Sequence, residues 1–497
     1  MKSFLARYKF LSLFAVIVIV AGCKQPETIV VDQAPSVAPT SDTTNVESTV
    51  NDGSFRQMVM GEYHTINTLD PLFADNASSM RAVQLVYEGL VRLDRNGSVV
   101  AGLAKRWDVS NDSLKYTFTL RSNIFYHDSD IFSTGTGRRM TSTDIKYVFE
   151  RMAKNNVPPK AANLFMDIRG FDAYYQEQRE VYFPGDRHLQ GVSGITTPTD
   201  STVAFELNNP DPQFMKKLAT PLAVIYPREA VSSTPEDFAA VGAGPFRFSS
   251  RDADSTLIFT RFQDYYNASE VYLNRVDIVT GATESKLFRE MGAGNIFMLP
   301  QLGPQLFQNI IDTSGQLNST YRNRYNLQMT NGYTEYVLRH NPGANLSADG
   351  ATYLANQART DTPYVNRFPA GIMKWSSPAD TTTQSANRPA IDNQIYSTFS
   401  RDPFIRTYLG SLSKKLQPFT SLQMVQIRPP SRNTGLLFTV SYPLIPETRW
   451  DTYNSLSRFK VPQAALLRTE ITGLTFNEYP WWLDLRGVKL PAAEELN

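Results

Sequence analysis

The sequence predicts a mixed α/β fold with more than one domain, and three observations lead to that prediction. Short segments in which apolar and polar residues alternate, typical of half-buried strands, recur along the chain. Amphipathic segments with helical spacing lie between them. About 440 residues follow the N-terminal region, enough for two or three domains with sizeable cores. Strands and helices mixed over this length indicate an α/β or α+β architecture.

The N-terminal residues have the pattern of a secretory signal peptide. Lys2, Arg7 and Lys9 form a basic region, and an apolar run from Leu11 to Gly22 follows, broken only by a serine. The run is shorter than the roughly 20 apolar residues that a membrane-spanning helix needs. We therefore expect residues 1–22 to be a lipoprotein signal peptide that is removed.

The single cysteine of the chain, Cys23, follows this run directly. Residues 20–23 (VAGC) resemble the lipobox of bacterial lipoproteins, in which the thiol is acylated and becomes the new N-terminus. The sequence thus predicts an anchor in membrane lipid through Cys23, on the periplasmic or another extracytoplasmic face of the cell envelope. The alternative is an ordinary secretory signal followed by an incidental thiol. Residues 23–53 contain no aromatic residue and little apolar surface, which predicts a flexible tether after the acylated cysteine.

Three segments beyond the tether are predicted as strands. Residues 114–121 (LKYTFTLR) alternate at every step, residues 201–207 (STVAFEL) repeat the pattern, and residues 257–262 (LIFTRF) do so less regularly. Alternation of this kind places one face of each strand against a core.

Helices are predicted over residues 141–154, 208–220 and 283–294. In the first, Thr141 and Asp144 have the spacing of a capping box. In the second, Asp211 is expected as the N-cap and Pro212 as the first helical residue. The third is expected to close at Gly292.

The charge and composition restrict the possible partners. Removing the signal peptide takes away three basic residues and no acid, so the formal charge falls from +1 to −2. This balance argues against nucleic acid as a partner. Aromatic residues make up 12% of the chain, and amphipathic rings of this kind suit a cleft that binds small molecules. We expect a monomer.

The sequence contains no recognisable catalytic, metal or cofactor motif. Its 4 histidines lie far apart, with no pair at metal-ligand spacing, at positions 64, 127, 188 and 340. Residues 133–139 (STGTGRR) place two arginines beside a glycine turn, which is typical of a solvated hairpin tip and alternatively of an anion site. The sequence therefore favours a binding protein. An envelope hydrolase would require catalytic groups that meet only in three dimensions.

Several stretches, taken in order, resemble one known family. They include the Thr68–Pro71 turn (TLDP), the Tyr87–Leu90 segment (YEGL) and the Val241–Phe248 strand (VGAGPFRF), in which Ala243 stands where threonine is usual. Together they are similar to the family 5 extracellular solute-binding proteins, the oligopeptide- and dipeptide-binding components of ABC importers. Each piece is short, and their order over residues 55 to about 295 makes the resemblance specific.

The resemblance implies a two-lobed, periplasmic-binding-protein-like fold with an extra subdomain nested in the first lobe. The expected divisions are a first lobe over residues 54–330 with the nested subdomain at about 80–190, a reduced second lobe over 331–460, and a return segment to the first lobe over 461–497. The second lobe departs from the family pattern through an insertion and an early end. No stretch resembles the tryptophan–aspartate segment that caps the amino terminus of the ligand in peptide-binding members.

The resemblance also implies a function and a site. The chain would capture peptides or similar solutes between its lobes and deliver them to the permease and ATPase subunits of an importer, without catalysis and without a cofactor. Candidate ligand-binding residues are Asp75, Asn76, Ala77, Ser78, Tyr333, Tyr336, Asn341 and Trp375. For Asn76 and Ser78 the alternative is that they cap a helix. The alternative for the whole protein is a non-transport member with a degenerate cleft that acts as an envelope interaction protein.

Overall fold

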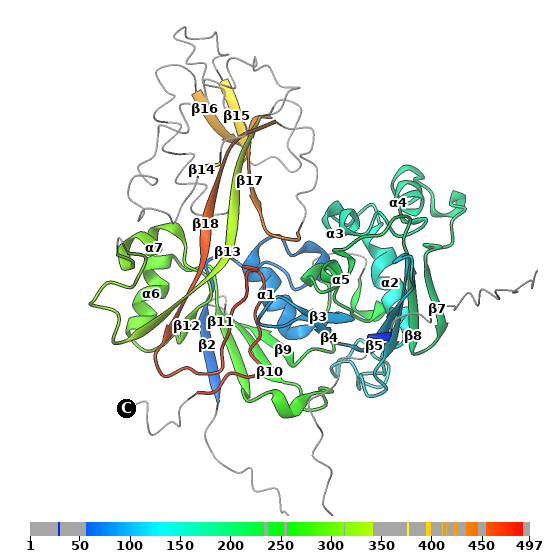
Figure 1. Ribbon diagram of the computed structural model, residues 1–497, viewed down its shortest axis with the longest axis horizontal. Coiled ribbons are helices and arrows are strands. Elements are labelled where there is room, and N and C mark those ends of the chain that lie inside the picture. The colour runs from blue at the N-terminus through cyan, green and yellow to red at the C-terminus, as the bar shows by residue number, and fades with distance from the viewer. Residues whose placement is uncertain are drawn as a thin grey trace, which may run out of the picture.

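The computed structural model describes residues 28–29, 56–232, 237–252, 256–312, 314–340, 375–376, 394–398, 410, 414, 421–425, 434–445 and 454–490. These residues form the mixed α/β architecture that the sequence predicts (Figure 1). A broad lower region contains all the α-helices labelled in Figure 1, and a pair of long strands rises from it into a second, upper region. None of the described helices is long and apolar enough to cross a membrane.

One large sheet runs through both regions. In spatial order it consists of β16 (Ser421–Val425), β15 (Gln394–Thr398), β17 (Thr434–Ser441), β13 (Tyr325–His340), β18 (Asn454–Arg468), β12 (Met298–Leu299), β2 (Gln57–Gly61), β11 (Arg275–Val279), β10 (Thr256–Arg261) and β9 (Phe246–Arg251), and β14 (Trp375–Ser376) pairs with β18. We call β2 and β9–β12 with their helices the first lobe, and β14–β17 with the upper parts of β13 and β18 the second lobe. The sheet is therefore the structural link between the lobes.

The β13–β18 pair contains a bulge between its two halves. Residues 325–329 of β13 pair with residues 464–468 of β18, and pairing resumes where Tyr333 meets Pro462. Three residues of β13 thus oppose the single residue Gln463. The lower half borders β12, whereas the upper half borders β17 and β14. The bulge consequently lies where one lobe passes into the other.

A separate five-stranded sheet forms the nested subdomain. Its strands, in order, are β1 (Thr28–Ile29), β5 (Ala104–Val109), β6 (Lys115–Leu120), β8 (Thr202–Glu206) and β7 (Ile195–Thr199), accompanied by α2 (Ser142–Met152), α3 (Pro159–Leu164) and α4 (Phe171–Glu180). The strands predicted at 114–121 and 201–207 are confirmed as β6 and β8, and the one at 257–262 as β10. The short strand β1 lies within the segment expected to be a tether and pairs with β5.

The helix α2 follows the sequence pattern closely. The backbone N–H of Thr141 donates to the Asp144 carboxylate at 2.9 Å, which confirms the predicted capping box. Its apolar residues Ile145, Val148, Phe149 and Met152 are all fully buried. Spacing of three and four residues places these side chains on one stripe, which packs against the subdomain core.

Among the remaining elements, α5 (Phe214–Leu218) begins later than predicted, with neither Asp211 as its N-cap nor Pro212 as its first residue, and α6 (Glu284–Gly292) ends where predicted. The others are α1 (Ala77–Val86), α7 (Pro304–Ile310), β3 (Val91–Leu93), β4 (Val99–Ala101) and the 3-10 turns η1 (Pro71–Phe73), η2 (Pro184–Asp186), η3 (Pro221–Ala223), η4 (Arg228–Ala230) and η6 (Ala268–Glu270). The N-cap of α5 is Gln213 and not Asp211, because the Asp211 carboxylate accepts the Gln213 N–H in a turn before the helix. Helix α6 does end at Gly292, but the residue with positive φ is Gly294.

A buried ion pair fastens the nested subdomain to the first lobe. Arg151 at the end of α2 donates to both carboxylate oxygens of Asp70, at 2.9 and 2.5 Å, and to the Tyr226 hydroxyl at 2.8 Å. Asp70 also caps η1 by accepting the Leu72 N–H. The Asp70–Pro71 turn of the first lobe is thus bound to α2 of the nested subdomain through this ion pair.

A close contact between backbones joins α1 to the VGAGPF segment. The Gly244 N–H donates to the Val86 carbonyl at 2.9 Å, and the Nε2 of His127 contacts the Gly244 carbonyl at 3.0 Å. Burial lowers the pKa of His127 to about 4, so its ring is neutral at ordinary pH. A Cβ on Gly244 would lie 2.7 Å from the carbonyl carbon and oxygen of Val86.

We predict that Gly244→Val destabilises the protein by about 2 kcal/mol or more, because the neighbouring atoms are backbone and cannot rotate away. Urea unfolding followed by tryptophan fluorescence measures the change. Gly185→Val is the matched control, since nothing lies within 4 Å of a Cβ at that position. Equal unfolding midpoints for the two variants would contradict the prediction.

Candidate functional site at the junction of the lobes

The N-terminal end of α1 lies at the junction of the two lobes. The Asn76 side chain accepts the Ser79 N–H at 2.9 Å, so Asn76 is the N-cap of the helix. The Asp75 side chain is exposed and Asn76 is partly exposed, whereas Ala77 and Ser78 are fully buried. The Asn76 amide nitrogen also donates to the Thr65 carbonyl and to Asp75, so of the four candidates in this segment Asp75 is the one with an exposed polar group to offer.

Ser78 belongs to a fully buried polar network behind this helix end. Its hydroxyl donates to the Glu62 carboxylate at 2.6 Å, and Arg81 donates to the same carboxylate from Nε at 2.8 Å. Arg81 also donates to the carbonyl of Pro480 in the return segment. The Glu62 and Arg81 side chains have no exposed surface. The network fixes the first turn of α1 to the end of β2 and to the return segment.

A turn that continues β17 of the second lobe touches α1 directly. The Ala77 N–H donates to the Tyr442 hydroxyl at 3.2 Å, and the indole N–H of Trp481 donates to the Pro443 carbonyl at 3.0 Å. Tyr442 is buried against the first-lobe core. Leu444 in the same turn has φ +64°, a left-handed conformation that a leucine adopts at an energetic cost. These contacts place a second-lobe segment against the helix end that carries the candidate residues.

The candidates on β13 lie on opposite faces of the strand. Tyr333 is partly exposed, and the Lys460 ammonium lies 3.9 Å from the centre of its ring. Tyr336 is three residues further along and is buried. Trp375 is in backbone register with Phe459, which pairs with Tyr336 on its other side. The structure therefore brings Asp75 and Asn76 near the lobe junction, and Tyr333 to the surface of the connecting pair.

Two of the candidates lie outside the described residues. Asn341 follows the last described residue of β13, and Cys23 precedes β1. Their proposed roles, ligand binding for Asn341 and lipid attachment for Cys23, stay predictions.

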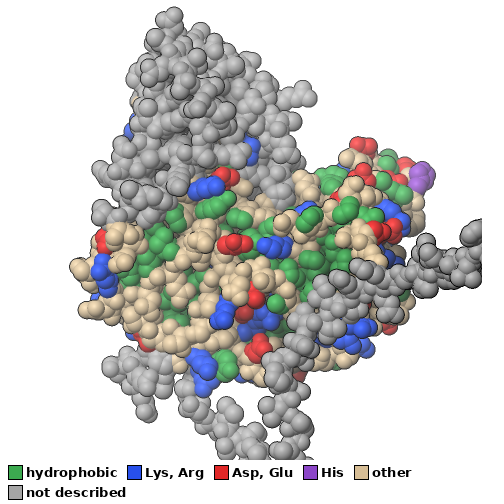
Figure 2. Space-filling model, viewed as in Figure 1, with side chains coloured by type: hydrophobic (Ala, Val, Ile, Leu, Met, Phe, Trp, Pro, Cys, Tyr) green, Lys and Arg blue, Asp and Glu red, His purple; other side chains and the backbone are tan. Residues whose placement is uncertain are grey.

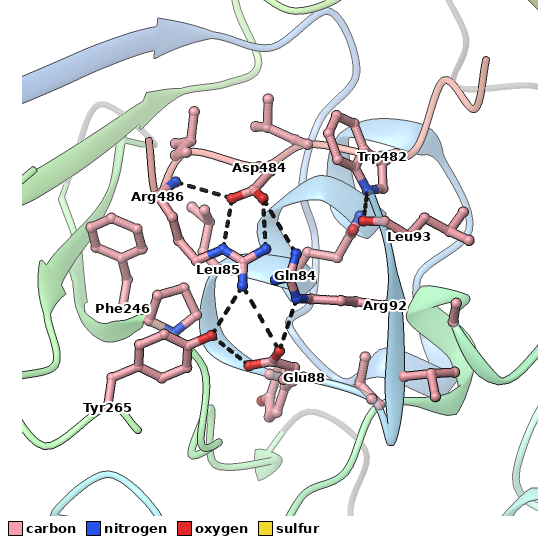
Figure 3. A pocket seen from close by; sticks show the side chains of 18 residues that line it. Gln84, Leu85, Glu88, Arg92, Leu93, Phe246, Tyr265, Trp482, Asp484 and Arg486 are labelled. Carbon is pink, nitrogen blue, oxygen red and sulfur yellow. Dashed lines mark hydrogen bonds and ion pairs between the residues drawn. The ribbon is translucent and has the colours of Figure 1, made fainter. Parts of the chain in front are cut away.

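A second polar cluster lies at the opposite end of α1 (Figure 3). Arg486 donates to both Asp484 oxygens, at 2.8 and 2.6 Å, and the Tyr265 hydroxyl donates to Glu88 at 2.7 Å. Although burial opposes ionisation, the hydrogen bonds from Arg486 hold the pKa of Asp484 below its ordinary value. Arg92 completes the cluster at about 4 Å from each carboxylate. The cavity beside these groups has a volume of about 60 Å³, which suits a few water molecules and no peptide. The cluster fastens the return segment to α1.

Sequence reasoning missed most of the residues that build this junction. Arg81 was the most visible signal, because it is a charged residue within an otherwise largely apolar helix (ASSMRAVQLV). The contact of Tyr442 with Ala77 joins residues 365 positions apart, and no local pattern announces it.

Within the described ranges, no set of three or more His, Cys, Asp or Glu side chains is arranged to hold a metal ion. Arg138, in the glycine-rich 133–139 segment, donates to the carboxylates of Asp144 and Glu229. These two carboxylates take the positions around the guanidinium at which an anion would bind. This supports the interpretation of residues 133–139 as a hairpin tip over that of an anion site.

A sequence model of the bacterial extracellular solute-binding proteins, family 5 (middle region), matches residues 98–347. The chain belongs to this family. The match covers the nested subdomain, the C-terminal strands of the first lobe and β13. As a family 5 solute-binding protein, the chain has the two-lobed architecture that the sequence predicts.

Two relatives of this family 5 protein are named for the peptides that they bind. Di/tripeptide-binding protein 1 of Pseudomonas aeruginosa (strain UCBPP-PA14) is 27% identical over 298 residues, covering 57% of this chain and 51% of the relative. Dipeptide-binding protein DppE of Bacillus subtilis (strain 168) is 25% identical over 273 residues, covering 53% and 46%. The chain spans about half the length of the curated relatives it matches.

The likeness to a solved structure extends over more of the chain. The murein tripeptide binding protein MppA of Escherichia coli superposes with a TM-score of 0.67 at 15% identity, covering 88% of this chain and 98% of MppA. At this identity the likeness concerns the fold, and it agrees with the two lobes and the sheet between them.

We predict that Arg81→Met destabilises this family 5 protein by about 3–5 kcal/mol, because it leaves the Glu62 carboxylate buried without its cation. The double variant Glu62→Leu/Arg81→Met removes both charges and should recover much of the loss. Urea unfolding measures both effects.

The matched control is Arg169→Met. Arg169 pairs with Glu206 on the surface, where both side chains are exposed, so its loss should cost less than about 1 kcal/mol. Similar losses of unfolding free energy for Arg81→Met and Arg169→Met would contradict the prediction, because they would show that burial does not determine how much the Glu62–Arg81 pair contributes to stability.

Proposed function

We propose that this protein is the substrate-binding lipoprotein of an ABC importer, capturing peptides or similar solutes between its lobes and delivering them to a membrane permease. Support comes from family membership and from the named relatives, which are peptide-binding proteins. The polar end of α1 at the lobe junction offers the exposed Asp75 carboxylate as a hydrogen-bonding group, whereas the Asn76 amide is engaged by Ser79, Thr65 and Asp75 itself.

The observation that carries the proposal is the bulge in the β13–β18 pair. The lobes are joined by continuous strands, and the pairing is interrupted at residues 330–332, between the half that belongs to each lobe. A bulge bends a strand and locally increases its twist while the pairing on either side is kept, and we propose that the two lobes move relative to each other about this bend. A solute that contacts both lobes favours the closed arrangement by its extra contacts there.

The absence of a recognisable amino-terminal clamp defines the expected mode of peptide binding. An ammonium buried without an acceptor is too costly to be a binding mode. We therefore propose that a peptide keeps its amino group in water and is held through main-chain hydrogen bonds and aromatic side chains such as Tyr333, Tyr336 and Trp375. Because Tyr333 and Tyr336 lie on opposite faces of β13, Tyr333, which is partly exposed, is the one of the two that a ligand reaches without rearrangement of the strand.

We predict that N-acetylation of a bound peptide changes its binding free energy by less than the roughly 2–5 kcal/mol of a broken buried charge pair. Ligand-free protein is first screened by thermal shift against a pool of di- and tripeptides, and calorimetry then compares each binder with its acetylated form. A strong preference for the free amine would reveal a clamp. Binding of neither form would contradict the proposed function and favour an envelope interaction protein.

We predict that Cys23→Ser abolishes membrane attachment and leaves a soluble or misprocessed chain, because we propose Cys23 as the only acylated residue. Membrane fractionation compares the variant with the parent chain, and mass spectrometry of the mature parent determines the modification. An unmodified thiol on the mature chain would contradict the lipoprotein assignment while leaving solute binding untouched.

A further inference from the structure

The loop after α4 presents two adjacent aromatic side chains to solvent. Tyr182 is 81% exposed and Phe183 is 64% exposed, and their rings meet edge to face with centroids 5.0 Å apart. Leu189 at the end of the same loop is also exposed. We call these three residues the aromatic knob. Large apolar side chains gathered at one exposed point of a folded domain mark an interaction site.

Hydrogen bonds from inside the loop hold the aromatic knob in place. The Arg187 guanidinium donates to the Gln178 side chain at 2.9 Å and to the Val181 carbonyl at 3.2 Å. The Glu177 carboxylate accepts the backbone N–H groups of His188 and Leu189 at 2.7 and 2.9 Å. The His188 hydrogen bond is the main reason why the pKa of Glu177 is lowered. The rings are thus presented by a preorganised loop, which reduces the entropy lost on docking.

The charges around the aromatic knob are asymmetric. The exposed charged residues next to the two rings are the acids Glu180 and Asp186, whereas the exposed Arg169, which pairs with Glu206, lies at the other end of α4. The basic residues turn inward, since Arg179 donates to the carbonyls of Lys154 and Val157 and Arg187 donates to its own loop. Figure 2 shows acidic, apolar and basic side chains and a histidine close together on this part of the nested subdomain. An acidic rim around an apolar centre is complementary to an apolar pocket with a basic rim.

We infer that the aromatic knob docks into an apolar pocket with a lysine- or arginine-rich rim on the extracytoplasmic face of the permease, an inference that rests on the proposed function. Two other occupants fit the charges less well. A second copy of this chain would bring its own acidic rim against the first, and a membrane surface with anionic lipids would repel it. Exposed aromatic side chains held by a rigid loop are typical of the residues that dominate the energy of protein interfaces.

The position of α4 suits a partner that also contacts the second lobe. In Figure 1, α4 lies on the side of the nested subdomain toward which β13 and β18 rise. A permease resting on both surfaces would contact the two lobes at once.

Site-specific photo-cross-linking tests this inference in the full chain. The benzophenone amino acid p-benzoylphenylalanine replaces Phe183, or as a control the exposed Ala173 on α4, in cells carrying the permease on which peptide uptake depends. The expected result is a covalent adduct with that permease at position 183 and none at position 173, identified by mass spectrometry. No adduct at 183, or adducts only with a second copy of the chain or with lipid, overturns the inference.

Transport measurements with substituted chains provide an independent test. Tyr182→Ser/Phe183→Ser should lower uptake of a bound tripeptide by about tenfold or more while its dissociation constant, measured by calorimetry, stays unchanged. Phe125→Ser is the control, because Phe125 is another exposed aromatic residue, at 42%, outside the knob. Unchanged uptake in the double variant with intact peptide binding overturns the docking inference alone. A parent chain that binds no peptide contradicts the proposed function instead.

Discussion

The pairing of β13 with β18 is the constraint on which the rest of the architecture depends. On one edge of the pair lies β17, and on the other lie β14 and β12, so the sheets of both lobes are extensions of the same two strands. Backbone hydrogen bonds hold this connection, and they place few demands on side chains. The side chains on the pair are therefore free to differ along its length: Tyr336 faces a core, whereas Tyr333 lies partly in solvent beneath the Lys460 ammonium.

Buried charges fix the position of α1 relative to this frame. The Glu62–Arg81 pair holds the first turn of α1, and the Glu88–Arg486 cluster holds the far end beside the return segment. Replacing such pairs with apolar side chains is often neutral or stabilising, so their contribution here is to geometry. The two charged groups of a buried pair must lie within hydrogen-bonding distance of each other. This requirement orients the end of α1 that contacts Tyr442. The Asp70–Arg151 pair does the same for the nested subdomain.

Local sequence patterns were sufficient for elements whose stabilising contacts are local. The stripe Ile145, Val148, Phe149 and Met152 predicted α2 with its cap, and strict alternation predicted β6 and β8, because burial of one face imposes those periods. The start of α5 was misplaced, since Asp211 was equally able to cap a helix or close a turn. The junction residues could not be found this way. Tyr442 acquires its role from Ala77, 365 positions away, and Glu62 and Trp481 acquire theirs from partners in other elements, 16 and 38 positions away. The interpretation of Asn76 as ligand group or cap depended on where α1 begins.

The position of β2 in the sheet has a consequence for biosynthesis. This strand is the first of the large sheet to be made, yet its neighbour β12 pairs on the other side with β18, about 400 positions later in the chain. Trp481 and Trp482, which fill the first-lobe core, are made later still. A nascent chain that lacks residues 461–490 has every early strand but neither the closing strand nor these two indoles. Its first lobe cannot complete its core, so this part of the fold forms only after the return segment has been made.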